Sequence, residues 1–232
     1  MLVLALDTAT PVVTAGLVSL TDTPRALAVR AHDGRRHGEL LMPAVRALCA
    51  ETGRALSEVG AVVVGAGPGP FTGLRVGIAS AAALGHALGV AVHGVCSHDA
   101  LALAAAGIDE PGAEHPQAGP GNLLVVTDAR RREVYWAAYD PAARRLSGPA
   151  VEPPETLAGR LGELAVGTVV GDRAFADRLG VAVGGPGAPT PEGLVGVAAA
   201  ALRAGRCPAP IEPLYLRRPD AVEPTGRKRV TA

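Results

Sequence analysis

Leu2-Val3-Leu4-Ala5-Leu6-Asp7 opens the chain as an apolar run that ends in an acidic residue, and Leu123-Leu124-Val125-Val126-Thr127-Asp128 repeats this pattern in the second half. Short apolar runs bounded by turn residues are typical of buried strands. Each run is followed by two further strand patterns, at 12–20 and 25–31 in the first half and at 133–139 and 144–151 in the second. Both halves are therefore predicted to begin with a three-stranded meander.

After each meander, the spacing of apolar residues predicts helices that alternate with strands. In the first half these are a helix at 37–52, a strand at 59–65, a helix at 71–88, a strand at 90–95 and a helix at 97–106. In the second half they are a helix at 154–161, a strand at 167–171, a helix at 173–179, a strand at 181–184 and a helix at 191–204. The order strand-strand-strand-helix-strand-helix-strand-helix therefore occurs twice, which indicates an α/β protein with a duplicated domain.

The boundaries of these units follow from composition. Residues 107–121 are rich in Pro, Gly and acidic side chains, which is typical of a linker or exposed loop. We therefore expect an N-terminal lobe at 1–106, a C-terminal lobe at 122–205 and an extended tail at 206–232. Leu214 and Leu216 are candidates to dock the tail across the first lobe.

Composition limits the classes of function. The 232 residues carry no formal net charge, so any contact with nucleic acid should be local or shared with a partner. Cys49, Cys96 and Cys207 lack metal-binding spacing and are expected to be free thiols. The sequence shows no targeting segment and no apolar stretch of the roughly 18 to 20 residues that span a bilayer, so a cytoplasmic protein without membrane contact is expected.

Several sequence blocks are more specific than this pattern. They are Leu4-Ala5-Leu6-Asp7-Thr8-Ala9-Thr10, His37-Gly38-Glu39-Leu40-Leu41-Met42-Pro43, Gly67-Pro68-Gly69-Pro70-Phe71-Thr72-Gly73-Leu74-Arg75-Val76-Gly77-Ile78, the residues 128–137, and Glu212-Pro213-Leu214-Tyr215-Leu216-Arg217. In this order they resemble the signatures of the TsaB family, also called YeaZ, over almost the whole chain.

The resemblance implies two ribonuclease-H-like lobes of the actin-like ATPase (ASKHA) superfamily. It also implies a non-catalytic subunit that pairs with a TsaD-like catalytic paralogue and works with a TsaE-like ATPase. That complex transfers threonylcarbamoyl to adenosine next to the anticodon of tRNAs reading codons that begin with A. ATP and metal are then expected in the partner and no cofactor in this chain alone, tRNA is reached through the complex, and a homodimer is expected when the partner is absent.

The residues at the metal positions agree with a non-catalytic copy. TsaD-like proteins place two His residues four apart at the start of the third helix, where one helical face can hold a metal. Here those positions carry Ser97 and Leu101, which cannot replace imidazoles. The turns after the first strand of each half, at 7–10 and 128–131, contain no Gly for a phosphate to approach. A small actin-like ATPase, an M22-type glycoprotease homologue and a homodimeric scaffold with unrelated partners remain as alternatives.

The Gly-rich loop before the helix at 71–88 is a candidate anion or nucleotide contact, because helix N-termini expose unpaired N–H groups. The candidate residues are Gly67, Gly69, Thr72 and Arg75. Pro68 and Pro70 each remove a donor, so a structural turn is the favoured interpretation. The run Arg130 to Arg132 could contact tRNA phosphate, although a solvated turn is favoured there as well.

The helices at 37–52 and 71–88 carry more apolar and small residues than one buried face requires. Glycine in a helix interior costs about 0.5 to 1 kcal/mol relative to Ala, which calls for a compensating close approach. We expect another chain to provide it, with packing inside the monomer as the alternative. The predicted partner-binding residues are Leu41, Met42, Val45, Cys49, Gly73, Leu74, Gly77, Ile78, Ala81 and Gly85.

Overall fold

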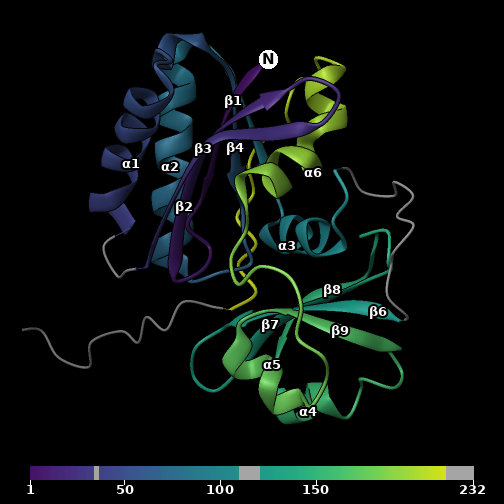
Figure 1. Cartoon of the computed structure of the whole chain (residues 1–232). Coiled ribbons are helices and arrows are strands. Elements are labelled where there is room, and N and C mark those ends of the chain that lie inside the picture. Colours follow the sequence, from purple (N-terminus) through teal and green to yellow (C-terminus); the bar gives the residue numbers. More distant parts are fainter. Residues whose placement is uncertain (34–36, 110–120, 218–232) are drawn as a thin grey trace, which may run out of the picture.

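Two mixed β-sheets, one from each half of the chain, form the frame of the molecule (Figure 1). The structure is a computed structural model that describes residues 1–33, 37–109 and 121–217. The first sheet has the order β3-β2-β1-β4-β5 and consists of β1 (Leu2–Asp7), β2 (Val12–Leu20), β3 (Pro24–Asp33), β4 (Val59–Gly65) and β5 (Ala91–Val95). The second has the order β8-β7-β6-β9 and consists of β6 (Asn122–Asp128), β7 (Val134–Tyr139), β8 (Arg145–Glu152) and β9 (Val166–Gly171).

The two sheets repeat one topology. β1 pairs antiparallel with β2 and parallel with β4, and β6 pairs in the same way with β7 and β9. Asp7 and Asp128 end the two equivalent central strands. The predicted repeat of the meander is thus confirmed.

The prediction of a fifth strand in the second half, at 181–184, is wrong. The chain there makes a single parallel bridge between Val169 and Val183, supported by two backbone hydrogen bonds, and then leaves the sheet. Gly185 adopts a φ of +73° and Pro186 has no N–H to donate, so the ladder cannot continue.

Helices cover both faces of the first sheet (Figure 1). α1 (His37–Thr52) and α2 (Phe71–Leu88) pack on one face, where Leu4 and Leu6 point, and α6 (Pro191–Arg203) packs on the other, where Val3 and Ala5 point. The short helix η1 (Leu56–Glu58) leads into β4, and α4 (Pro154–Ala158) and α5 (Arg173–Leu179) pack on the second sheet. Among the described residues, no helix is long and apolar enough to cross a bilayer.

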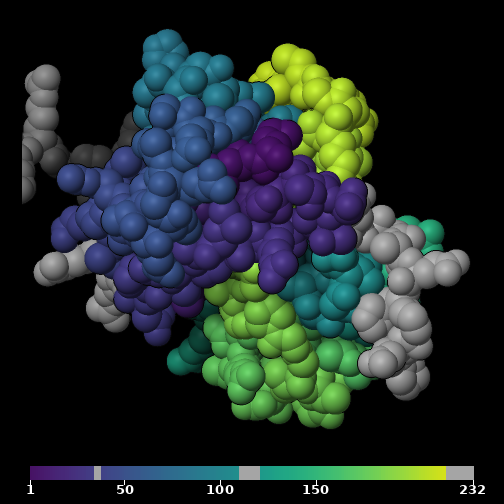
Figure 2. Space-filling view, turned by 45° about the horizontal axis from the view of Figure 1, so that its top comes forward, coloured from purple at the N-terminus to yellow at the C-terminus, as the bar shows by residue number. Residues whose placement is uncertain are grey.

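The helix α3 (Ser97–Ala106) lies between the two sheets (Figure 1). Its Leu101 and Leu103 are buried in a core that includes Val125 and Tyr139 of the second sheet. α6 comes from the second half of the chain, yet it lies on the body formed by the first half (Figure 2). The division into lobes at 1–106 and 122–205 stays a prediction, since α3 and α6 each carry contacts across it.

The glycine stripe of α2 faces its own chain. Any side chain at Gly73 or Gly77 would overlap Thr8, which follows β1, and one at Gly85 would overlap Val92 of β5. Thr8 Oγ1 also donates a hydrogen bond of 2.7 Å to the Gly73 carbonyl. Close approach within the monomer therefore offsets the cost of these glycines.

The sequence predicted that this stripe lies at the centre of a surface that binds another chain. The packing against Thr8 and Val92 shows instead that the stripe faces the interior of this chain. The predicted pairing residues outside this stripe fall into a buried group and a more exposed group. Leu41, Val45 and Leu74 are buried, whereas Met42 is exposed and Cys49 and Ile78 are half-buried. Ala81 is fully buried with the stripe. Only the outer group stays available to a partner, and its role stays a prediction.

We expect Gly77→Ala to lower the melting temperature, although Ala is the better helix former. The added methyl group must displace Thr8, and overpacking of this kind typically costs about 1 to 3 kcal/mol. Thermal unfolding measures the effect, with Gly38→Ala in α1, where an added methyl group meets open space, as the matched control that should not lower the melting temperature.

The double variant Thr8→Ala/Gly77→Ala tests the contact itself. It should be more stable than the sum of the two single changes predicts, because the overlapping hydroxyl is gone. Strict additivity would show that Gly77 does not pack against Thr8.

Candidate functional site

Asp7 lies fully buried at the carboxyl end of β1. Ser97 Oγ donates a hydrogen bond of 2.6 Å to Asp7 Oδ2, and the Ala9 amide donates one of 2.9 Å to Oδ1. Gly65 ends the neighbouring strand β4, where any side chain would overlap the carboxyl group of Asp7. The chain thus encloses this acidic side chain on every side and leaves it no exposed surface.

The environment of Asp7 makes it a weaker acid than usual. Burial raises the pKa of Asp7 from 3.8 to about 6, although the hydrogen bonds from Ser97 and from the backbone amides of Ala9 and Thr10 oppose the shift. Folding therefore extends the range in which this carboxyl group is protonated from about pH 4 up to about pH 6, and the carboxylate still predominates at neutral pH.

Both positions at which metal ligands were predicted to be lost have a structural role. The Ser97 hydroxyl is bound to Asp7, and the Leu101 side chain is fully buried in the core beneath the second sheet. Within residues 1–33, 37–109 and 121–217, no group of three or more His, Cys, Asp or Glu side chains is placed to hold a metal ion. The expectation that this chain alone binds no cofactor stays a prediction.

His98 links the two halves of the chain. Its Nε2 lies 2.8 Å from Thr127 Oγ1 on β6, and both side chains are buried. Burial, together with the nearby Arg145 guanidinium, lowers the pKa of His98 to about 3, so the imidazole is neutral. A neutral, enclosed imidazole of this kind supports the packing of α3 on β6.

Asp99 forms the next link. Its Oδ1 accepts hydrogen bonds of 2.7 Å from the Tyr139 hydroxyl and 2.9 Å from Arg145 Nε, and Arg145 also pairs with Oδ2. Burial and the Asp99 charge raise the pKa of Tyr139, and the same two effects raise the pKa of Cys96 to about 12. The Cys96 thiol is therefore protonated and a poor nucleophile.

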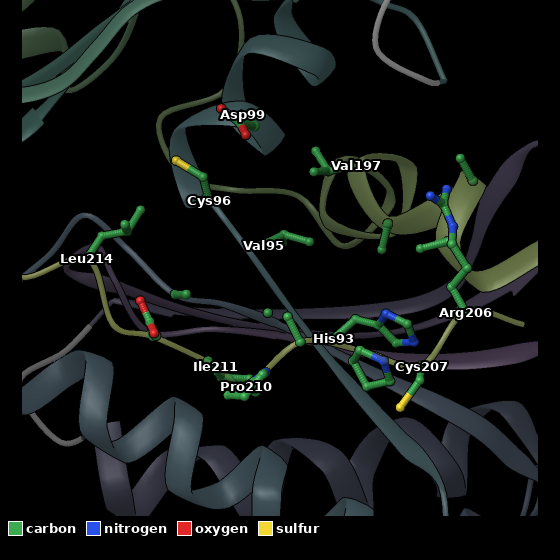
Figure 3. Close-up of a pocket in the computed structure, with 18 of the residues that line it drawn as sticks. His93, Val95, Cys96, Asp99, Val197, Arg206, Cys207, Pro210, Ile211 and Leu214 are labelled. Carbon is green, nitrogen blue, oxygen red and sulfur yellow. The ribbon is translucent and has the colours of Figure 1, made fainter.

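A cavity of about 840 Å³ lies between β5, α6 and the C-terminal residues 206–214 (Figure 3). The labelled lining residues are His93, Val95, Cys96, Asp99, Val197, Arg206, Cys207, Pro210, Ile211 and Leu214. Cys96 and Asp99 lie toward α3, away from His93 and Cys207 (Figure 3). Arg145 pairs with Asp99, and Cys96 and Asp99 lie apart from His93 and Cys207, so these groups do not converge on one reacting atom (Figure 3).

Gly69 and Gly73 pack against the turn that follows β1. A side chain at Gly69 would overlap Ala9, and the Gly73 carbonyl is bound by Thr8. This packing favours a structural role for the loop. The anion contact predicted for Gly67, Gly69, Thr72 and Arg75 stays a prediction.

Of these four residues, Arg75 has partners that the sequence could not indicate. Its guanidinium carbon lies 3.8 Å from the centroid of the Phe71 ring, and its Nε donates a hydrogen bond of 3.3 Å to the Tyr215 hydroxyl. The Phe71 and Tyr215 rings lie 4.9 Å apart at an angle of 39°. These three exposed side chains form what we call the aromatic platform, composed of Phe71, Arg75 and Tyr215.

The tail reaches the platform by folding back over the first half. Ile211 packs against Gly94 of β5, and the Leu214 amide donates a hydrogen bond of 2.8 Å to the Ala66 carbonyl. Arg217 then donates one of 3.0 Å to the Ala129 carbonyl and pairs with Glu133 in the second half. The predicted docking through Leu214 is confirmed, and residues 218–232, with Arg227-Lys228-Arg229, lie outside the described residues.

We expect stability to fall as pH rises through the pKa of Asp7. The folded-state pKa of about 6 exceeds the unfolded value, so the stabilising protonation is complete below about 4 and lost above about 6. A shift of this size corresponds to about 3 kcal/mol between the two limits.

Asp7→Asn should remove this dependence while keeping the shape of the side chain. Urea unfolding at pH 5 and pH 8 should show the variant gaining stability relative to the unaltered chain at the higher pH. An identical pH dependence in both proteins would show that Asp7 does not titrate in this range.

Comparison with known proteins relates this geometry to a family. Residues 31–174 match the family model described as "TsaD: tRNA N6-adenosine threonylcarbamoyltransferase". The chain is 45% identical over 225 residues to the uncharacterized protein Rv3421c of Mycobacterium tuberculosis, which covers 94% of this chain and 93% of that one. It is 32% identical over 105 residues to the tRNA threonylcarbamoyladenosine biosynthesis protein TsaB of Escherichia coli, a match that covers 45% and 42% of the two chains.

The solved structure of YeaZ from Pseudomonas aeruginosa is 31% identical and covers 88% of this chain and 93% of its own, with a TM-score of 0.68. This likeness extends over both sheets and confirms the predicted two-lobed α/β fold of the actin-like ATPase superfamily. The chain therefore belongs to the TsaD family and, within it, is a protein of the TsaB/YeaZ type.

Proposed function

We propose that this chain is a non-catalytic subunit for threonylcarbamoyl transfer to adenosine next to the anticodon of tRNA, and that it acts by pairing with a TsaD-like transferase. The observation that carries the proposal is the start of α3. There Ser97 is bound to Asp7, His98 to Thr127 and Asp99 to Arg145. His98 and Asp99 hold α3 to the second sheet and Ser97 holds it to the end of β1, so all three polar side chains are engaged in contacts within the chain.

The turns after β1 and β6 also support the proposal that this subunit has no catalytic activity of its own. Asp7 is sealed from solvent, and the second turn carries Arg130, Arg131 and Arg132 where actin-like ATPases place a glycine-bearing hairpin. We therefore assign ATP and metal to the TsaD-like partner and to a TsaE-like ATPase. This assignment places the chain in the cytoplasm, where tRNA is modified.

The outer faces of α1 and α2 are the proposed pairing surface. Met42 is 38% exposed on α1, and Ala79 and Ala82 are exposed on α2, with Cys49 and Ile78 half-buried beside them. Small and apolar exposed residues on two helices suit helix-to-helix packing between chains. A homodimer through the same surface is expected when the partner is absent, since related subunits can offer equivalent faces.

Met42→Arg combined with Ala82→Arg tests this assignment. Two charged side chains buried at the centre of an interface should weaken pairing with the TsaD-like protein by at least about tenfold. Pairing is measured by sedimentation, and threonylcarbamoyl incorporation into tRNA is measured with the partner and the ATPase present. Both should fall together.

Leu146→Arg combined with Val183→Arg is the matched control, because both side chains are exposed in the second half, Leu146 on β8 and Val183 beside β9. It should leave pairing and incorporation unchanged. Transfer by this chain without any partner, or full transfer by the partner without this chain, would contradict the proposed function.

A further inference from the structure

The turn between β6 and β7 holds three consecutive arginines in a conformation that L-residues seldom adopt. Arg130, Arg131 and Arg132 have φ values of 63°, 54° and 63°, and all three are exposed. The turn is fixed by its own flanks: Asp128 Oδ1 accepts a hydrogen bond of 2.7 Å from the Arg130 amide, and the Glu133 amide donates one of 3.0 Å to the Arg130 carbonyl. Three exposed cationic side chains therefore lie on one short hairpin tip, where the Arg130 guanidinium also pairs with Asp128 at 3.3 Å, and we call residues 130–132 the arginine turn.

A second feature lies beside this turn. Tyr215 belongs to the aromatic platform, and Arg217, two residues further on, binds Ala129 and Glu133 at the two ends of the arginine turn. Alternate Cα atoms lie at most about 7 Å apart, so the tail brings the platform and the turn together. Residues 215–217 of the tail thus connect a cationic turn to a group of planar side chains.

These two kinds of group recognise different parts of one ligand. Guanidinium groups pair with phosphate oxygens, whereas aromatic rings and stacked guanidinium planes accept an unstacked nucleobase. Phe71 is 36% and Tyr215 38% exposed, and Arg75 is exposed as well. An acidic peptide would use the charges but not the planar groups, and a duplex keeps its bases out of reach of the platform.

We propose that the arginine turn and the aromatic platform together bind a single-stranded stretch of RNA, with the phosphates on the turn and a base on the platform. This contact is made by the chain itself and needs no partner, so it goes beyond the proposed function. Because the chain has no net charge, binding is local and involves few phosphates.

Fluorescence anisotropy with the full chain and a labelled, unstructured ten-nucleotide RNA tests the proposal. The logarithm of the association constant should fall with the logarithm of salt concentration by about 0.7 for each phosphate engaged. Arg131→Gln with Arg132→Gln should make this slope shallower by roughly 1.4. The matched control is Arg25→Gln with Arg54→Gln, which removes the same charge and should leave the slope unchanged.

The two control residues lie far from the arginine turn and the aromatic platform. In the first sheet, Arg25 of β3 lies opposite Ser19 of β2, and Ser19 lies opposite Leu2, at the end of β1 that is remote from Asp7. Arg54 lines a small recess with Leu2 and Ser19 at the same end.

Changes on the platform should act differently from changes on the turn. Arg75→Lys keeps the charge but loses the planar group, and Tyr215→Leu keeps apolar contact but loses the ring. Each should weaken binding roughly fivefold or more and leave the salt slope unchanged. Unchanged melting temperatures verify that the variants remain folded.

Several outcomes would overturn the proposal. They are equal losses in the control pair and in the turn variants, equally tight binding of duplex RNA, displacement of the RNA by poly-glutamate at equal charge concentration, and no binding at low salt. Since none of these measurements includes a TsaD-like protein, their failure leaves the proposed pairing untouched, and failure of pairing leaves the RNA contact untouched.

Discussion

Three consecutive side chains at the start of α3 hold this helix to the end of β1 on one side and to the second sheet on the other. Ser97 binds the carboxyl group that ends β1, His98 binds Thr127 of β6, and Asp99 binds Tyr139 and Arg145 of β7 and β8. A buried polar group that loses its partner costs about 1 to 3 kcal/mol, so the halves cannot separate here without leaving several groups unpaired. The cavity beneath the tail and the path of the tail itself both depend on this placement of the second sheet.

The contacts of Ser97, His98 and Asp99 also bear on the proposed loss of catalysis. The resemblance implies that catalytic paralogues bind a metal from this same turn of helix, which requires side chains open to the cleft. Here the hydroxyl of Ser97 and the apolar side chain of Leu101 are directed into the protein instead. The polar side chains at this helix start are engaged within the chain instead, which supports the proposed role as a pairing subunit.

Glycines also allow close packing around the turn that follows β1. Gly65 leaves space for the carboxyl group of Asp7, and Gly73 and Gly77 leave space for Thr8. The helix α2 can therefore lie directly on the turn, and its N-terminus then meets the returning tail at Tyr215. The conformational cost of the glycines is offset inside the chain, which explains them without any second molecule.

Local periodicity in the sequence by itself determined α1, α2 and α3 to the residue and the repeated meander, because each depends on neighbouring residues. The assignment of Ser97 and Leu101 to the metal positions of catalytic paralogues came from the family resemblance. Only the tertiary structure decided which way the glycine stripe faces, that α6 covers the first sheet, and that the strand expected at 181–184 is reduced to one bridge. The aromatic platform belongs to the same group, since Arg75 and Tyr215 are 140 residues apart. The direction of a helical face, and the partner of a distant side chain, are set by which elements pack together, and no sequence period contains that information.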